Sequence, residues 1–290
     1  MTRVRFIIPA LLMIGFWAGL AGPAQVAFAQ QAPATPLAKS EPPKTEAQPV
    51  SVGARGCNVP RELARFDHSL NRLAQAVVRD RIVHIIALGS SSTAGSGASS
   101  PQASYPARLD AELDRRFPGR DFQVANFGTG GLLARDMVER LHTHIIALKP
   151  ALVIWQTGVN DAIQDVGLEA FRETLQRGVR DMKAAGIDVI LVNHQFYPRA
   201  ERVAGYVDYL TVMREVAEAE RVPVFRRFAI MKHLVKSGQH TSEELLAPDN
   251  FHLNDLSYGC LADLMADAID ERIKAGRITA SQLLPVQPQR

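Results

Sequence analysis

The run Asp249-Asn250-Phe251-His252, near the C-terminal end, places a carboxylate close to a histidine. A histidine that moves protons in catalysis needs a partner carboxylate to fix its tautomer and stabilise its cation. An aspartate three residues earlier can reach the imidazole across a single turn. The pair therefore has the chemistry of a general base and its orienting group. The remaining histidines have no equivalent setting, and they stand at positions 68, 84, 142, 144, 194, 233 and 240.

A candidate nucleophile lies in residues 89–95, Gly-Ser-Ser-Ser-Thr-Ala-Gly. The run directly follows an apolar segment with the composition of a strand. A serine at the turn from a strand to a helix exposes its hydroxyl, and the amides of the helix face an incoming anion. Taken alone, such a run is more typical of an ordinary loop than of a catalytic turn.

Two further runs carry groups that could stabilise negative charge on a substrate oxygen. Residues 126–131, Asn-Phe-Gly-Thr-Gly-Gly, contain glycines that let the backbone approach a ligand and point N–H groups at it. Residues 158–161, Gly-Val-Asn-Asp, offer the side-chain amide of Asn160, a donor that can line an oxyanion hole. Taken alone, the first run is more typical of a flexible loop, and the second is also typical of an ordinary helix cap.

The elements that must position these runs follow from alternating apolar and amphipathic segments. The predicted strands are residues 82–88, 122–126, 151–156, 187–192 and 222–225, and helical spacing runs through 59–78, 105–117, 132–148, 168–185, 203–219 and 256–275. Continuous apolar strands are typical of a sheet covered on both faces. His84 interrupts the first strand and is expected to be packed. The predicted fold is an α/β protein, a three-layer α/β/α sandwich around a mostly parallel five-stranded sheet, with ligands bound at the carboxyl ends of the strands.

In their order along the chain, these four runs resemble the motifs of the SGNH (GDSL-like) hydrolases, a family named for a Ser, a Gly, an Asn and a His. Residues 89–95 are similar to the family's first motif, Gly-Asp-Ser-x-x-x-Gly, and residues 126–131 to its second, Asn-x-Gly-x-x-Gly. Residues 158–161 are similar to Gly-x-Asn-Asp, and residues 249–252 to Asp-x-x-His. The resemblance extends over about residues 82–270 and implies a flavodoxin-like fold. One departure leaves the turn geometry and the local electrostatics open, because Ser90 stands where the family motif has Asp.

The resemblance implies a serine esterase whose catalytic triad is Ser91, His252 and Asp249. It also implies an oxyanion hole formed by the N–H groups of Ser91 and Gly131 and the amide of Asn160, with no metal and no organic cofactor. The expected substrate is a short-chain, acetyl-like O-acyl ester, because nothing in the sequence resembles a long hydrophobic groove. The alternatives are an O-acyltransferase acting on an envelope polysaccharide and a non-catalytic glycan-binding protein on the same scaffold. The family also includes lysophospholipases and thioesterases.

The segment 194–198 follows the fourth predicted strand and reaches the same edge of the sheet. Gln195, Phe196 and Tyr197 are therefore candidates for contact with an acyl group or a sugar. Packing explains such residues equally well, and the same holds for residues 155–156.

The ends of the chain predict an exported protein. Residues 1–29 have a basic start, an apolar run shorter than the roughly 20 residues that span a bilayer, and a small-x-small cleavage site at 27–29. They are expected to be a signal peptide, the alternative being an uncleaved anchor. Residues 30–55 are expected to be a disordered Pro/Ala-rich linker, residues 56–278 the hydrolase domain, and 279–290 a flexible tail. The mature protein is expected to be secreted or periplasmic, without a stable membrane span.

The two cysteines, the net charge and the spacing of the histidines bear on a disulfide, on nucleic-acid binding and on metal binding, respectively. Cys57 and Cys260 are predicted to form a disulfide if the first and last predicted helices pack side by side, the alternative being two free buried thiols. A net charge of +3 is too small to predict nucleic-acid binding. His142 and His144 would point to different sides of a helix, so no metal site is expected. The sequence gives no indication of the oligomeric state.

Overall fold

The computed structural model describes residues 56–282; the predicted signal peptide, the predicted linker and residues 283–290 lie outside this range. Five strands form one sheet in the order β2-β1-β3-β4-β5, and every pair is parallel. The strands are β1 Ile82–Gly89, β2 Asp121–Gly128, β3 Leu152–Gln156, β4 Asp188–Val192 and β5 Val224–Phe225. This order is the flavodoxin-like one, so the predicted fold is confirmed.

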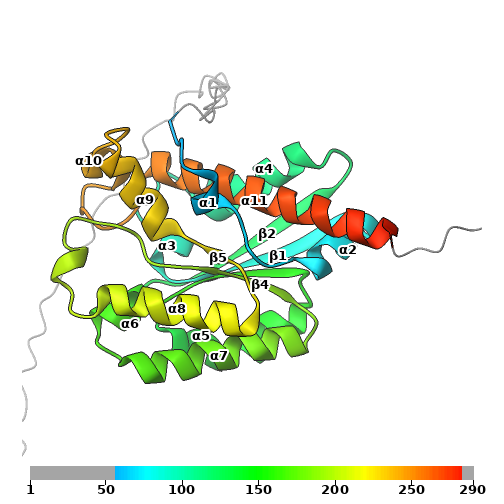
Figure 1. The fold of residues 1–290 in the computed structure, drawn as a ribbon, viewed down its shortest axis with the longest axis horizontal. Helices are drawn as coiled ribbons and strands as arrows, with labels where there is room; N and C mark the ends of the chain where they lie inside the picture. The colour runs from blue at the N-terminus through cyan, green and yellow to red at the C-terminus, as the bar shows by residue number, and fades with distance from the viewer. Residues whose placement is uncertain (1–55, 283–290) are drawn as a thin grey trace, which may run out of the picture. The chain divides into compact units, whose positions relative to one another are not determined.

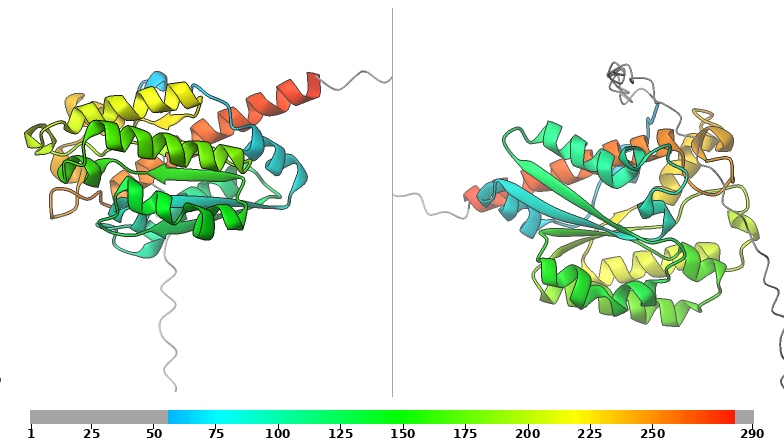
Figure 2. Two further views of the ribbon diagram at one scale, coloured as in Figure 1. Left: turned by 90° about the horizontal axis from the view of Figure 1, so that it is seen from below. Right: turned by 180° about the vertical axis from the view of Figure 1, so that it is seen from behind.

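Helices cover both faces of the sheet and make the three predicted layers (Figure 1). One face carries α2 (Asn71–Arg79), α4 (Tyr105–Arg116) and α11 (Asp255–Gln282), and the other carries α5 (Ala134–Glu139), α7 (Leu168–Ala184) and α8 (Tyr206–Glu220). Figure 2 shows the sheet between these two layers. The shorter helices are α1 Arg61–Ala64, α3 Ser91–Ala94, α6 Val159–Ile163, α9 Arg227–Lys236 and α10 Ser242–Leu245.

Burial along the strands follows their place in the sheet. All five residues of the central strand β3 are buried, whereas in the edge strand β2 only Phe122 is. His84 is exposed rather than packed, so that prediction was wrong. Near the start of β1, it lines a hollow together with Arg79 of α2 and Lys149.

The structure divides two of the predicted helices. The segment 132–148 becomes α5, a π-helical turn at Leu141–Ile145 and a 3-10 turn at Ile146–Leu148. It ends at Lys149, which has φ +50°, because the proline that follows disfavours the α-helical conformation. The segment 59–78 becomes α1 and α2, and the residues between them turn Phe66 and Leu70 into the core.

Two further differences concern the C-terminal half. Helix α11 runs on to Gln282, past the predicted domain boundary at residue 278. Helix α9 was not predicted from the sequence. Within residues 56–282, no helix combines the length and the apolar character needed to cross a membrane.

The structure contains the predicted disulfide between Cys57 and Cys260. Their Cα atoms are 5.7 Å apart, within the range of about 4.4–6.8 Å that disulfides require. The bond joins the segment before α1 to α11, the helix that follows the Asp249–His252 run.

Candidate active site

Ser91, His252 and Asp249 lie in a chain of hydrogen-bonding contacts. Ser91 Oγ is 2.9 Å from His252 Nε2, and His252 Nδ1 is 2.6 Å from Asp249 Oδ2. The other carboxylate oxygen, Oδ1, accepts hydrogen bonds from the backbone N–H groups of Phe251 and His252 at 3.0 and 2.9 Å. A hydroxyl, an imidazole and a carboxylate in this arrangement can pass the hydroxyl proton to the imidazole.

The pKa of Asp249 lies below its ordinary value. Burial raises it, but the hydrogen bonds from the His252 side chain and from the backbone of His252 and Phe251 outweigh that effect. The Asp249 side chain is 48% exposed, so solvent screens its charge. The carboxylate therefore remains ionised through the neutral pH range, ready to stabilise an imidazolium.

The segment that carries the histidine folds back on itself before α11 begins. Leu246 and Leu253 form an isolated antiparallel bridge, and Ala247 N donates to His252 O at 2.8 Å. Between them Asn250 has φ +55°, a left-handed conformation that asparagine adopts more readily than most residues. This turn holds the aspartate and the histidine on the same side.

The histidine and serine segments are fastened to each other by long-range hydrogen bonds. Ser99 N and Ser99 Oγ donate to the Asp255 carboxylate at 2.8 and 2.5 Å. Tyr258 Oη donates to Ser96 O at 2.7 Å. Because Asp255 and Tyr258 lie in the first turn of α11, these bonds bring the end of the histidine segment against the loop that follows Ser91.

The turn that carries the serine is held by a close approach between the end of β2 and α3. Ser91 is the first residue of α3, directly after β1. A side chain at Gly128, the end of β2, would collide with the backbone nitrogen of Ala94. The Asn126 side-chain amide donates to Thr93 O at 2.8 Å and fastens β2 to α3. Glycine and asparagine at these two positions therefore hold the second run against the first.

The predicted oxyanion loop is clamped by the run 158–161. Asn160 Nδ2 donates to Leu132 O at 2.9 Å, and a carboxamide has a second N–H to offer a ligand. Asp161 is 1% exposed and its Oδ1 accepts from Ala134 N at 3.1 Å; burial raises the pKa of this carboxyl. Gly131, directly before Leu132, is exposed and has φ +81°, and a Cβ at the neighbouring Gly130 would lie 3.9 Å from Ser91 Cβ. The clamping role of Asp161 was not predicted, although it belongs to the recognised run.

The three residues expected to contact a substrate have unequal exposure. Gln195 and Tyr197 are buried; Gln195 Oε1 accepts from Arg227 Nη2 at 3.0 Å, and Tyr197 packs edge-on against Phe251. For these two side chains the structure favours packing, the alternative interpretation. Phe196 is half-buried and remains a candidate for substrate contact.

Arg227, at the start of α9, was not predicted to belong to the site and is 2% exposed. Its Nε donates to Asn193 O at 2.9 Å, and its Nη2 holds Gln195, whose Nε2 lies 3.4 Å from Phe251 O. This chain of contacts runs from α9 to the residue before the histidine. No signal in the sequence marks it, because the residues that form it are distant along the chain.

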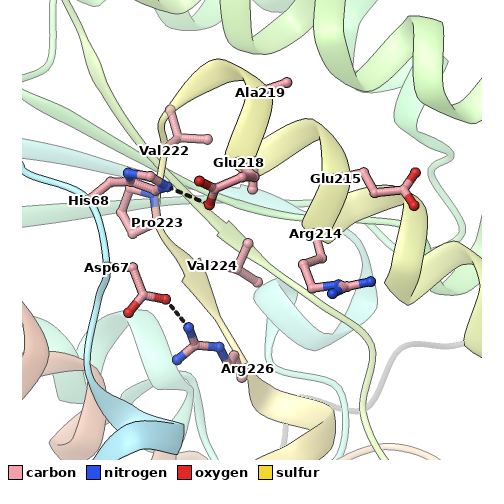
Figure 3. Close-up of a pocket in the computed structure, with 11 residues that line it drawn as sticks. Asp67, His68, Arg214, Glu215, Glu218, Ala219, Val222, Pro223, Val224 and Arg226 are labelled. Atoms are coloured by element: carbon pink, nitrogen blue, oxygen red, sulfur yellow. Dashed lines mark hydrogen bonds and ion pairs between the residues drawn. The ribbon is translucent and has the colours of Figure 1, made fainter.

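A cavity of about 650 Å³ lies away from these residues, beside the edge strand β5 (Figure 3). In it His68 Nε2 is 3.2 Å from Glu218 Oε2, and Arg226 forms an ion pair with Asp67. None of the serine, histidine and aspartate described above lines this cavity. The residues that line this cavity include no Ser, Thr or Cys side chain that could act as a nucleophile.

No metal site stands out among the residues described by the structure, where no three His, Cys, Asp or Glu side chains are grouped to hold an ion. His142 Nε2 is 3.2 Å from Asp181 Oδ2, and His144 Nδ1 is 2.7 Å from Thr143 Oγ1.

Comparisons with solved structures give the same fold. A two-domain esterase active on acetylated mannans is 24% identical with a TM-score of 0.64; the alignment covers 75% of this chain and 58% of that one. A lipase/acylhydrolase from Enterococcus faecalis is 25% identical with a TM-score of 0.55, covering 66% of this chain and 96% of that one. An acetyl xylan esterase is 20% identical with a TM-score of 0.56, covering 64% and 100%. This chain therefore spans less than two thirds of the length of the mannan esterase.

No curated protein matches the chain. The model of the Non-GDSL lipase-like family matches residues 56–275, nearly the whole of the chain that the structure describes. The protein therefore belongs to the Non-GDSL lipase-like family and has the three-layer α/β/α fold of the SGNH enzymes.

Proposed function

We propose that the protein is a serine esterase that acts through a triad of Ser91, His252 and Asp249. The observation that carries the proposal is the 2.9 Å contact between Ser91 Oγ and His252 Nε2, backed by the 2.6 Å contact to Asp249. His252 takes the hydroxyl proton as Ser91 Oγ attacks the ester carbonyl, and then gives it to the leaving alcohol. Water repeats the sequence on the acyl-enzyme and releases the acid.

The N–H groups of Ser91 and Gly131 and the side chain of Asn160 are proposed to form the oxyanion hole. The support is the pair of clamps at Leu132 and Ala134, which hold the glycine loop against residues 158–161, and the approach of Gly130, where a Cβ would lie 3.9 Å from Ser91 Cβ. Donors fixed before the reaction stabilise developing charge without reorganising. Removal of one such donor typically raises the barrier by about 2.7–4 kcal/mol.

A short acyl group, such as acetyl, on a glycan is the proposed substrate. The site is open, because Gly130, Gly131, Asp249 and Asn250 are all exposed. An open site accepts a bulky alcohol such as a polysaccharide, whereas a long acyl chain needs a deep apolar groove. One structurally similar protein is an esterase active on acetylated mannans, and another is an acetyl xylan esterase.

Export to an oxidising compartment is also proposed. Disulfides persist in secreted and periplasmic proteins and are rare in the cytosol. The Cys57–Cys260 bond and the predicted signal peptide therefore support the same location. Mass determination of the mature protein would test cleavage after residue 29.

The function is tested by turnover of p-nitrophenyl esters of increasing chain length and by acetate release from acetylated mannan and xylan. We expect fastest turnover of the acetyl ester, none with Ser91→Ala, and a covalent fluorophosphonate adduct on Ser91. Acetate released by the Ser91→Ala variant at the wild-type rate would refute the triad. Transfer of acetyl to a sugar hydroxyl in place of water would instead identify the protein as an acyltransferase.

A further inference from the structure

Gln156, the last residue of β3, is a buried hydrogen-bond acceptor beneath the nucleophile turn. Its side chain is 0% exposed. Its Oε1 accepts from Ser90 N and Ser90 Oγ at 3.1 Å each and from Thr93 Oγ1 at 3.2 Å. A backbone N–H can only donate, so the oxygen rather than the nitrogen of the amide must face the turn. One oxygen therefore accepts hydrogen bonds from the residue before Ser91 and from a residue after it.

The hydrogen-bond network of Gln156 continues through Thr93 to Tyr105. Thr93 Oγ1 lies 3.3 Å from Tyr105 Oη. Burial raises the pKa of Tyr105 to about 12, so the phenol stays protonated and can donate to Thr93 while Thr93 donates to Gln156. Gly89 leaves the room for this contact, because a Cβ there would lie 2.9 Å from Gln156 Oε1 and would collide with Thr93 Oγ1.

The acceptor is neutral. A glutamine oxygen accepts hydrogen bonds as a carboxylate does, but without the negative charge. Ser90 stands where the family motif has Asp, so neither Ser90 nor Gln156 places a carboxylate beside the nucleophile. A buried carboxylate at hydrogen-bonding distance from Ser90 N would oppose the negative charge that forms on the substrate oxygen next to Ser91.

We infer that Gln156 is the positioning residue of the nucleophile turn. Through Ser90 and Thr93 it fixes the hydroxyl and the backbone N–H of Ser91, and its neutrality keeps a buried negative charge away from the developing oxyanion. The inference rests on the proposed role of Ser91 as the nucleophile. Gln156 acts through its two neighbours, since its hydrogen bonds are to them and not to Ser91.

Three variants separate positioning from stability. Gln156→Met keeps the approximate volume and removes the acceptor. Gln156→Glu keeps the shape and the acceptor and adds a group that can ionise. Ile154→Ala is the matched control, because Ile154 is a fully buried residue of the same strand that makes no contact with the turn through hydrogen bonds.

Each variant is compared with the wild type by three measurements. These are the rate at which a fluorophosphonate modifies Ser91, kcat and KM for p-nitrophenyl acetate from pH 5 to 9, and the melting temperature. We expect Gln156→Met to lower both the modification rate and kcat by about 10- to 100-fold, the loss typical of a slightly misplaced reacting group, with KM nearly unchanged. Ile154→Ala should lower the melting temperature and leave both rates at the wild-type level.

The ratio of Gln156→Glu to wild-type activity should fall as the pH rises. Burial favours the neutral acid of this variant, whereas the donors of Ser90 and Thr93 favour its carboxylate, and a rising pH converts the first form into the second. A residue with only a structural role would give a ratio independent of pH. This variant also provides the test if Gln156→Met does not fold.

The inference is overturned by a wild-type modification rate in Gln156→Met, by an equal loss of rate in Ile154→Ala, or by wild-type activity of Gln156→Glu across the whole pH range. If the wild type is modified at Ser91 but hydrolyses no ester, the proposed function fails while the modification rates still decide the role of Gln156. A wild type in which Ser91 is not modified at all would overturn both.

Discussion

Removal of the disulfide should destabilise the fold much more than it slows the reaction. The bond closes a loop with a sequence separation of 203 residues, for which the chain-entropy model gives about 5 kcal/mol at 25 °C. Measured contributions are more often about 2–4 kcal/mol. At about 2–4 °C of melting temperature per kcal/mol for a domain of this size, the double variant Cys57→Ala/Cys260→Ala should melt about 5–15 °C below the wild type.

The effect on turnover should be small at 25 °C. The hydrogen bonds of Asp255 with Ser99 and of Tyr258 with Ser96 still hold the start of α11 against the serine loop. We expect kcat within about two- to threefold of the wild type, which corresponds to less than about 1 kcal/mol in the barrier.

Thermal unfolding followed by circular dichroism, with and without reductant, checks this prediction. Reductant should lower the wild-type melting temperature toward that of the double variant and leave the double variant unchanged. A double variant that melts within about 2 °C of the wild type, less than 1 kcal/mol at this size, would show that the bond contributes nothing and refute the reasoning.

Three further outcomes are expected. Ser91→Ala should abolish ester turnover, whereas Ser90→Ala and Ser92→Ala should retain most of it; the reverse result would show that the nucleophile has been misassigned. A general base acts only in its unprotonated form, so kcat/KM should fall on the acid side, and a flat profile from pH 5 to 9 would contradict a histidine base. Burial raises the pKa of Asp188 to about 6, although hydrogen bonds from the backbone of α2 oppose the shift. The folded-state pKa of Asp188 lies above the unfolded value of about 3.9. Its contribution to the free energy of unfolding is therefore fully present below about pH 4 and is lost as the pH rises through 6, a decrease of at most about 2–3 kcal/mol. Asp188→Asn should remove that decline in denaturant midpoints measured from pH 4 to 8, and an unchanged decline would rule Asp188 out as its source.

The sequence predicts the sheet well because each strand carries its own signal. Residues 85–88, 152–155 and 189–192 are continuous apolar runs, and the structure buries them between two helical layers. The edge strand β2 mixes polar and apolar residues, and β5 has only two residues. The interruption of the segment 132–148 was missed, because helical spacing continues through the π-helical turn and only Pro150 marks the end.

The candidate site was predictable to the extent that its residues fall in short runs. Asp249 and His252 are three residues apart, and a local turn with Asn250 at positive φ is enough to join them. The meeting of His252 with Ser91 across a separation of 161 residues depends on the fold, and only the resemblance to a known set of motifs predicted it.

The residues that hold the site in place could not be predicted, because their contacts link distant parts of the chain. Gln156 reaches Ser90 across 66 residues, Asp161 reaches Ala134 across 27, and Arg227 reaches Gln195 across 32. In the sequence each is a polar residue next to an apolar strand or at the start of a helix, a setting shared by many residues without a role in catalysis. Burial distinguishes them, since all three are at most 2% exposed. A buried polar group is costly without a hydrogen-bonding partner. The partners of Gln156 and Asp161 belong to the segments that carry the nucleophile and the proposed oxyanion donors, and Arg227 reaches the segment of the base through Gln195.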